Sequence, residues 1–543
     1  MPKSTGTAAR AFPEPSTGSR LGHNADMEHP ARATIARPGA GLETLESRLR
    51  SLLPAELYAP VWLHPDSDGL HRVFVHLRTL LRILYDQMPS HVADNPPPAS
   101  ATRHEWQTGT LMFTDLAGFT PFIEANATSG RSGTEVVQRV LNRYLASMID
   151  IFGHAGGNLL EFTGDALLVR FSADGRNDDA RRAVNAALRM QRAMEEFRVI
   201  ETPTGTSSFG MRVGIHVGQF LAADVGTPRR RDHVLFGEAV RITKAAEGAG
   251  VVGRVCLTPE AAAAAGDRFH LEPGNDGHLL VVDDLDEQEL GFYDLNPQQR
   301  RLRAPVMLDR SVPALLEEIE RSLDLVEPLA TYMPRPLLEV MVETAQDRRI
   351  PVEMSEPVVM FVKLEGFDTG LEDADEVEVA ARMEAFSGVF ARLDAAASAR
   401  GGMLRRVTYQ ATGSDVLVCF GVLNAHSDDA RRAGEMAMQV PGICETVLAD
   451  LQGRLGARIG FRIGMASGPV FAAEMGQHMG RREFNLVGDP VNVAARLAAK
   501  AGPGEILVAP DLAASLGGGL PIASHGTMAL KGKSEAVEVF RLG

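Results

Sequence analysis

Asp178-Asp-Ala-Arg-Arg-Ala183 recurs unchanged at residues 428–433, 250 positions further along the chain. Four matches in one order at nearly constant spacing indicate an internal duplication. The chain of 543 residues therefore carries two copies of one domain, which we place at 108–297 and 356–543. The other three matches are 211–218 (MRVGIHVG) with 461–468 (FRIGMASG), 113–119 (FTDLAGF) with 361–367 (FVKLEGF), and the glycine pairs 156–157 and 401–402.

The first copy alternates strand and helix patterns. Apolar residues at helical spacing predict a helix over 134–152, and Asp178-Asp179 are suited to the start of a second helix. The tight turn Gly164-Asp165 joins two of the predicted strands into a hairpin. The order strand, helix, hairpin, helix, strand predicts a ferredoxin-like α+β domain. The expected strands are 110–114, 159–162, 166–171 and 211–216.

The segments outside the two copies differ in composition. Residues 1–40 are rich in Ala, Pro, Gly, Ser and Arg, and we expect this N-terminus to be disordered. Residues 41–107 form a predicted helical N-terminal region and linker, with a helical pattern at 70–87. Residues 298–355 form a predicted helical linker, patterned over 312–346. These helices serve either as packing spacers or as a regulatory or dimerising element.

Charge and composition exclude several classes of protein. The formal net charge is −15, and an acidic surface repels phosphate backbones, so we expect no nucleic-acid partner. The three cysteines, Cys256, Cys419 and Cys444, form no CxxC pair, which argues against zinc and disulfide frameworks. No apolar run reaches the ~20 residues that cross a bilayer, and no signal peptide is evident. We expect a cytoplasmic protein without a transmembrane segment.

Two carboxylates of the first copy are candidates for metal binding. Asp115 follows a strand-like run, and Asp165 lies in the hairpin turn. Either residue alone is a common cap or turn. Two carboxylates on neighbouring strands, however, are the usual means of holding two cations for phosphoryl transfer. The backbone of Gly118, Phe119 and Thr120 can turn N–H groups toward phosphates at a helix start.

Taken together, these motifs resemble the class III adenylate and guanylate cyclase family. The second copy adds Leu-Val-Gly-Asp-Pro-Val-Asn-Val-Ala-Ala-Arg at 486–496, another hallmark of that family. The tandem arrangement is most similar to the soluble, bicarbonate-responsive adenylate cyclases. The resemblance implies one active site between two domains, with two Mg²⁺ or Mn²⁺ ions at Asp115, Leu116 and Asp165 of the first. The second domain would supply catalytic Asn492 and Arg496.

Each copy lacks what the other keeps. At the metal positions the second copy has Lys363 and Ser414, and a protonated lysine cannot coordinate a cation. At the Asn and Arg positions the first copy has Arg241 and Ala245. We therefore expect an intramolecular pseudo-heterodimer with one complete site and one inactive twin pocket. Independent decay would rarely leave complementary halves. The pairing needs no second chain, which allows a monomer.

The resemblance also implies substrate-binding residues. The base would be read at Gln410 and Asn485, although Arg405, Arg406 or Thr412 could replace Gln410 because the second hairpin is longer. Lys531 or Lys533 would contact the terminal phosphates. We favour ATP as substrate and cyclic AMP as product, by analogy with tandem adenylate cyclases. The alternatives are a guanylate cyclase, a module that binds nucleotide without turnover, and an interaction scaffold.

The twin pocket is a possible regulatory site. Lys244 could help to bind bicarbonate or another small effector there, as basic residues do in the bicarbonate-responsive relatives. Glu161 would repel an anion, or would pair with Lys363 across the interface.

Overall fold

The computed structural model leaves the predicted disordered segment 1–40 outside the described residues. No helix in the described part of the chain is long and apolar enough to span a membrane. The described residues are 42–97, 102–127, 130–172, 175, 177–203, 205–295, 309–348, 350, 352–410, 413–452, 460–477, 480–516, 519–530 and 535–543.

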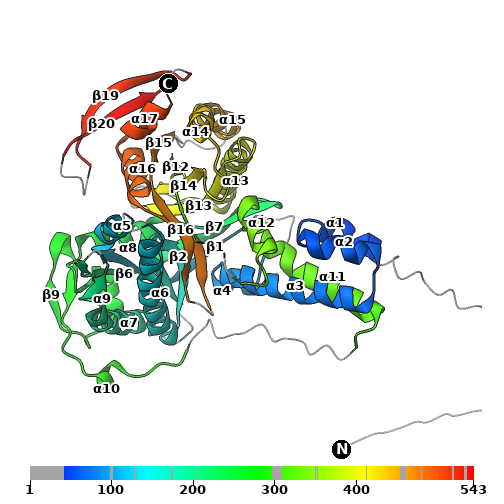
Figure 1. The fold of residues 1–543 in the computed structure, drawn as a ribbon. Helices are drawn as coiled ribbons and strands as arrows, with labels where there is room; N and C mark the ends of the chain where they lie inside the picture. The colour runs from blue at the N-terminus through cyan, green and yellow to red at the C-terminus, as the bar shows by residue number, and fades with distance from the viewer. Residues whose placement is uncertain are drawn as a thin grey trace, which may run out of the picture.

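The first domain is built on a mixed sheet with the strand order β2-β3-β1-β6-β8-β10-β9, and β7 pairs with β6 (Figure 1). The first four strands have the ferredoxin-like order, so the predicted fold class is confirmed. The main elements are β1 (Arg103–Ala117), α5 (Phe119–Ala127), α6 (Gly130–His154), β2 (Gly157–Thr163), β3 (Ala166–Ser172), α7 (Asp179–Ala193), β6 (Gly210–Thr227), β7 (Arg230–Phe236) and α8 (Glu238–Ala249). The shorter ones are β4 (Ile200–Thr202), β5 (Gly205–Ser207), β8 (Val255–Leu257), α9 (Pro259–Ala265), β9 (Leu271–Pro273), β10 (Leu279–Val281) and α10 (Glu287–Leu290).

The second domain repeats this plan in the order β13-β14-β12-β15-β18-β20-β19, with a separate sheet β11-β16-β17. Its helix α13 begins after Asp375, whose carboxylate accepts from the N–H of Glu378 at 2.8 Å, an N-cap. The elements are β11 (Glu353–Ser355), β12 (Val358–Glu365), α13 (Glu376–Ser398), β13 (Met403–Gln410), β14 (Gly413–Phe420), α14 (Asp429–Ala437), α15 (Val440–Gln452), β15 (Gly460–Ser467), β16 (Val470–Gly476), β17 (Arg482–Val487), α16 (Asp489–Lys500), β18 (Ile506–Val508), α17 (Pro510–Ser515), β19 (Ile522–Met528) and β20 (Val537–Leu542).

The arginine at the fifth position of the repeated hexapeptide connects a helix to the turn before a strand. Arg182 is 2% exposed, binds Asp178 at 2.7 Å, and donates to the carbonyl of Ala155 at 2.9 Å. This contact ties α7 to the turn before β2. Gly156 has φ +82° there, and a Cβ on it would lie 2.7 Å from the Arg182 guanidinium. In the second copy Arg432 donates to the carbonyl of Arg400 at 2.6 Å, so the repeated segment makes the same kind of contact in both domains.

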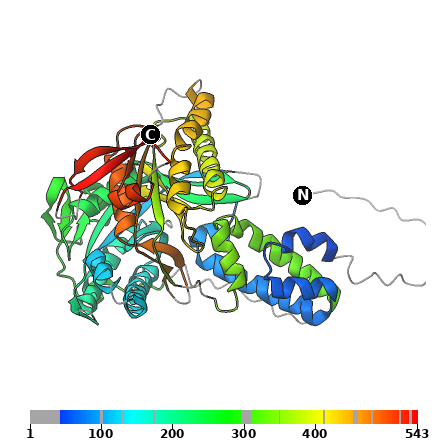
Figure 2. The same cartoon turned by 45° about the horizontal axis from the view of Figure 1, so that its top comes forward.

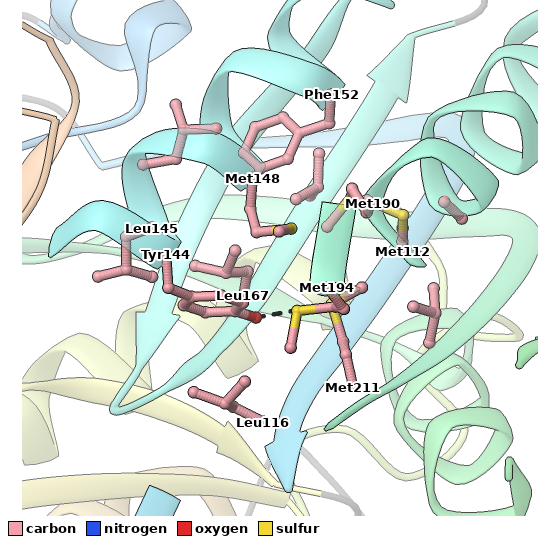
Figure 3. Packing of buried hydrophobic residues seen from close by; sticks show 14 of the residues in the cluster. Met112, Leu116, Tyr144, Leu145, Met148, Phe152, Leu167, Met190, Met194 and Met211 are labelled. Carbon is pink, nitrogen blue, oxygen red and sulfur yellow. Dashed lines mark hydrogen bonds between the residues drawn. The ribbon is translucent and has the colours of Figure 1, made fainter. Parts of the chain in front are cut away.

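The core of the first domain fixes the end of β1. Met112 and Leu116 of β1 belong to one buried apolar cluster with Tyr144 and Met148 of α6, which are fully buried (Figure 3). The hydroxyl of Tyr144 donates to the sulfur of Met211 at 3.6 Å. Because Asp115 stands between these anchored positions, its carboxylate leaves the strand on the face opposite to Leu116.

The two domains exchange β-ribbons. Residues of β6 and β7, such as Phe236, belong to the core of the second domain, where Phe236 meets Phe386 of α13 edge to face at 5.0 Å. Residues of β16 and β17, such as Phe471 and Val487, belong to the core of the first. Each domain therefore completes the other, and their interface is as buried as a domain interior.

Helices from before and between the two domains form a third unit, which we call the helical module (Figures 1 and 2). In it α3 packs along α11, and Arg48 of α1 binds Asp324 and Glu327 of α11 at 2.7 and 2.8 Å. The module consists of α1 (Leu42–Leu49), α2 (Ala55–Leu63), α3 (Ser67–Asp86), α4 (Ser90–Asp94), α11 (Val312–Ala330) and α12 (Arg335–Glu343).

Candidate functional site

Asp115 and Asp165 lie at one end of the first sheet. Asp115 is near the end of β1 and stands opposite Arg212 of β6. Asp165 lies in the turn between β2 and β3. The guanidinium of Arg212 donates to Asp115 and also pairs with Glu247 of α8 at 3.0 Å. This contact holds the Asp115 carboxylate while leaving 30% of its side chain exposed.

The electrostatics of this pair suit a divalent cation. Burial and the charge of Asp115 raise the pKa of Asp165 well above its ordinary value. Two carboxylates that oppose each other's ionisation are stabilised by a cation between them. Among the described residues no third His, Cys, Asp or Glu completes a cluster. A bound ion would therefore need further oxygen ligands, such as phosphate, water or the carbonyl of Leu116, whose side chain is buried.

The turn after β1 requires glycine. Gly118 has φ +92°, and a Cβ on it would lie 2.5 Å from the carbonyl oxygen of Ser208. Helix α5 begins directly afterwards at Phe119, whose ring is buried against Phe122 and Phe209. The first N–H groups of α5 thus open beside the two carboxylates, as the sequence suggested for phosphate binding.

One pocket joins residues of both domains. It contains about 690 Å³ of space that no protein atom fills, part of which is open to solvent. The amide of Asn492 donates to the Thr120 hydroxyl at 3.4 Å, and the amide of Asn485 to the carbonyl of Phe162 at 3.2 Å. The lining comprises Phe119, Thr120, Ile123, Phe162, Thr163, Gly164 and Asp165 of the first domain with Phe361, Thr408, Leu417, Asn485, Leu486, Val487, Gly488, Val491, Asn492 and Ala495 of the second.

The predicted residues of the second domain lie on β17 and α16. Asn485 is 4% exposed on β17, and Asn492 is in the first turns of α16. Arg496 follows Asn492 by one helical turn and is partly exposed beside the pocket residue Ala495. Lys531 and Lys533 lie outside the described residues.

The strand register corrects the equivalence assigned to Gln410. In the first hairpin Glu161 pairs with Leu168, and in the second hairpin Arg406 pairs with the equivalent Leu417. The extra residues of the second hairpin therefore lie at its tip, where Gln410 pairs with Gly413. The equivalent of Glu161 is Arg406, one of the alternatives noted above. Counting back from the hairpin glycine failed because an insertion at a turn does not alter the pairing below it.

Arg406 belongs to a buried network of ion pairs. It donates to Glu483 and, at 3.2 Å, to the carbonyl of Phe162, and it lies 3.8 Å from Glu161. Glu483 also accepts from Arg405 and Arg481, each at 3.0 Å, and these three cations lower its pKa against the effect of burial. Thr408, two residues further along β13, lines the pocket instead. Sequence reasoning missed Thr408; the alternation of side chains along β13 would have indicated it once Arg406 was placed.

The positions that correspond to the twin pocket hold buried or partly buried charged side chains. Lys363 stands opposite Arg462 as Asp115 stands opposite Arg212, and it is 2% exposed. Burial lowers the pKa of Lys363, whereas neighbouring Asp415 favours its charged form. Lys244 lies 4.6 Å above the ring of Phe113, and burial lowers its pKa as well. Glu161 is 8% exposed, and its pKa is raised by burial.

Asp415 is expected to make stability depend on pH. Burial raises its pKa to about 7 although Lys363 and Lys244 oppose the shift. The unfolded chain releases this proton near pH 4, so the folded state binds one more proton between these values and loses stability as pH rises. Between pH 5 and 8, wild type should lose about 1–3 kcal/mol more than Asp415→Asn. Denaturant titrations of both proteins at several pH values in this range measure the free energy of unfolding. If that free energy depended on pH in the same way for both proteins, the raised pKa of Asp415 would be contradicted.

Comparisons with known proteins agree with the fold and the duplication. The model of the adenylate and guanylate cyclase catalytic domain matches residues 102–281 and 351–542. Mouse adenylate cyclase type 10 is 24% identical over 413 residues, 72% of this chain and 23% of that protein. An adenylate cyclase of Anabaena cylindrica is 34% identical over 143 residues, 26% of each chain. The chain thus spans about a quarter of the length of these two relatives.

A solved structure shares the tandem fold. The class III adenylyl cyclase-like ATP-binding protein from Pseudomonas aeruginosa superimposes with a TM-score of 0.53 at 15% identity, over 82% of this chain and 93% of that one. The match extends beyond a single catalytic domain, as the duplication requires. With two family matches that together cover well over half of its length, the chain belongs to the adenylate and guanylate cyclase catalytic domain family.

Proposed function

We propose that the protein is an adenylate cyclase that converts ATP into 3′,5′-cyclic AMP and pyrophosphate at the single composite pocket. The observation that carries the proposal is the meeting of Thr120 and Asp165 from one domain with Asn485 and Asn492 from the other. The twin pocket has Lys363 and Ser414 in place of the carboxylates. The relatives named as adenylate cyclases support ATP as the substrate.

Each residue has a role that its position allows. In the reaction the ribose 3′-oxygen would give up its proton to water and attack the α-phosphorus in line. The bond between the α-phosphorus and the α,β-bridging oxygen would break, and pyrophosphate would leave. Asn492 would orient the ribose, and Arg496 would stabilise the negative charge that develops on the α-phosphoryl group. The N–H groups at the start of α5 would bind phosphate oxygens, and Lys531 or Lys533 would add a contact to the terminal phosphates.

Asp115 and Asp165, with the carbonyl of Leu116, would hold two Mg²⁺ or Mn²⁺ ions. Bound ions of this kind supply Lewis-acid chemistry, which lowers the pKa of a coordinated hydroxyl and neutralises phosphate charge.

Base selection is assigned to Asn485 and Thr408. Both line the pocket, and an amide can donate and accept, so Asn485 can satisfy a purine edge. Arg406 is held by Glu483 and Phe162 and is not part of the lining. Gln410 stays a weaker candidate at the hairpin tip.

The effector hypothesis for the twin pocket has less support. Lys244 and Lys363 already have the acids Glu161 and Asp415 as neighbours. An incoming bicarbonate would have to compete with these carboxylates.

The test is product formation by the purified protein with Mn²⁺ or Mg²⁺ and either ATP or GTP. We expect cyclic AMP from ATP and little cyclic GMP from GTP, each measured by chromatography against a blank that lacks both Asp115 and Asp165 carboxylates. Cyclic GMP as the main product would make the protein a guanylate cyclase. Binding of nucleotide without either product would make it a non-catalytic module.

A further inference from the structure

Strand β17 lies between the helical module and the nucleotide pocket. Phe484 and Leu486 belong to the apolar core of the module, together with residues of α3 and α11. Asn485, between them, lines the pocket and donates to Phe162 of the first domain. Because side chains alternate along a strand, a shift of the module-facing residues moves Asn485 as well.

Strand β17 is an edge strand of its sheet, and two side chains satisfy the backbone groups of Phe484 on that edge. The N–H of Phe484 donates to the amide oxygen of Gln87 at 3.2 Å. The carbonyl of Phe484 accepts from Arg405 at 2.8 Å. Both groups point away from β16, so no strand satisfies them. The Gln87 side chain therefore supplies the hydrogen bond that a neighbouring strand would otherwise make to Phe484, the residue next to Asn485.

Gln87 bridges the two strands of the ribbon. It is 4% exposed and follows the last residue of α3. Its amide nitrogen donates to the Glu474 carboxylate of β16 at 2.7 Å, and Glu474 is the cross-strand partner of Phe484. The amide can do this because its nitrogen donates to the carboxylate while its oxygen accepts from the N–H.

The linker before the second domain also contacts Glu474. Glu474 also accepts from the N–H of Ile350 at 3.0 Å and lies 3.7 Å from Arg482. Arg482 lies 3.5 Å from Asp86, the last residue of α3. The end of α3 and the linker are thus joined to the ribbon through buried polar contacts, which hold a defined geometry.

We propose that Gln87 is a positioning residue for recognition of the base, acting on Asn485 through the N–H of Phe484. The inference rests on the proposed nucleotide site but not on turnover. It makes the helical module part of the apparatus that distinguishes one purine from another. Loss of the bridge would let β17 shift at Phe484 and would loosen the Asn485 amide in the pocket.

The experiment measures binding of 3′-deoxy-ATP and 3′-deoxy-GTP, which lack the attacking hydroxyl, to the full chain with Mn²⁺. Gln87→Met keeps the length of the side chain and removes both hydrogen bonds. We expect it to bring the ratio of the two Kd values closer to one by about five- to tenfold, the equivalent of one hydrogen bond. Asn485→Ala should change the ratio similarly, and the double variant should change it no further.

Gln346→Ala is the matched control. Its exposed side-chain amide donates to Glu56 of α2 at 3.5 Å instead of to β16 or β17, so the ratio should stay at the wild-type value. An unchanged ratio in Gln87→Met, or additive effects in the double variant, would overturn the proposal. A wild-type ratio near one would overturn it as well. Absence of cyclic product from wild type, with the ratio changing as expected, would refute the cyclase activity and leave the positioning role supported.

Discussion

Asp115→Ala is expected to lower kcat at least a thousandfold while the protein stays folded. The substitution removes one of two carboxylates that face a common site and leaves Asp165 to hold a cation alone. A loss of this size corresponds to about 4 kcal/mol of transition-state stabilisation, within the range attributed to metal-assisted phosphoryl transfer. Asp115 is partly exposed and lies outside the apolar core, so the thermal midpoint should change little. The measurements are cyclic AMP formation, Mn²⁺ binding by electron paramagnetic resonance, and thermal unfolding.

The duplication provides a matched control for Asp115. Lys363 occupies the same position in the second domain, as the shared strand register shows. Lys363→Met keeps the apolar stem and should leave kcat within about threefold of wild type, since the proposed function assigns no chemistry to the twin pocket. Retention of a tenth or more of the activity by Asp115→Ala would refute the metal assignment. Equal losses in both variants would refute the division into an active and an inactive pocket.

Arg496→Ala should have the second largest effect, a loss of about a hundred- to a thousandfold in kcat with little change in KM. That split is expected because the guanidinium would act on charge that appears only in the transition state. Its place one turn beyond Asn492 on α16 puts it on the same face of the helix as Asn492. Steady-state kinetics with ATP measure both constants.

Two further variants test whether the effect depends on the guanidinium group and on the second domain. Arg496→Lys keeps the charge but not the planar fork and should recover only part of the rate. Arg241 stands on α8 at the position of Asn492 in the first domain, is exposed, and pairs with Glu238. Arg241→Ala should therefore keep wild-type kinetics. A rise in KM without loss of kcat in Arg496→Ala would show a role in substrate binding instead.

The features that could be predicted from sequence are those carried by short continuous segments. The duplicated motifs place the carboxylates near the end of β1 and in the hairpin turn because each depends only on its neighbours in the chain. The complementary pair Lys363 and Ser414 was visible for the same reason. The glycine at 118 marked a turn that the backbone confirms with φ +92°.

The features that could not be predicted depend on contacts between distant segments. Periodicity indicated helices at 70–87 and 312–346, yet nothing in either pattern shows that α3 packs along α11. The hairpin insertion hid the equivalence of Arg406 and Glu161, because the sequence does not reveal on which side of a turn residues were added. The bridge from Gln87 to β17 joins residues nearly 400 positions apart, a contact that no local signal encodes.

The helical module and the exchanged ribbons also bear on how the proposed activity should respond to dilution. Halves on separate chains would meet only by diffusion and would lose activity below their dissociation constant. Here a covalent linker, folded against the N-terminal helices, keeps the partner domain at a very high local concentration. Specific activity should therefore stay constant from micromolar to picomolar protein, and control has to act on the geometry of the pair instead of on its assembly.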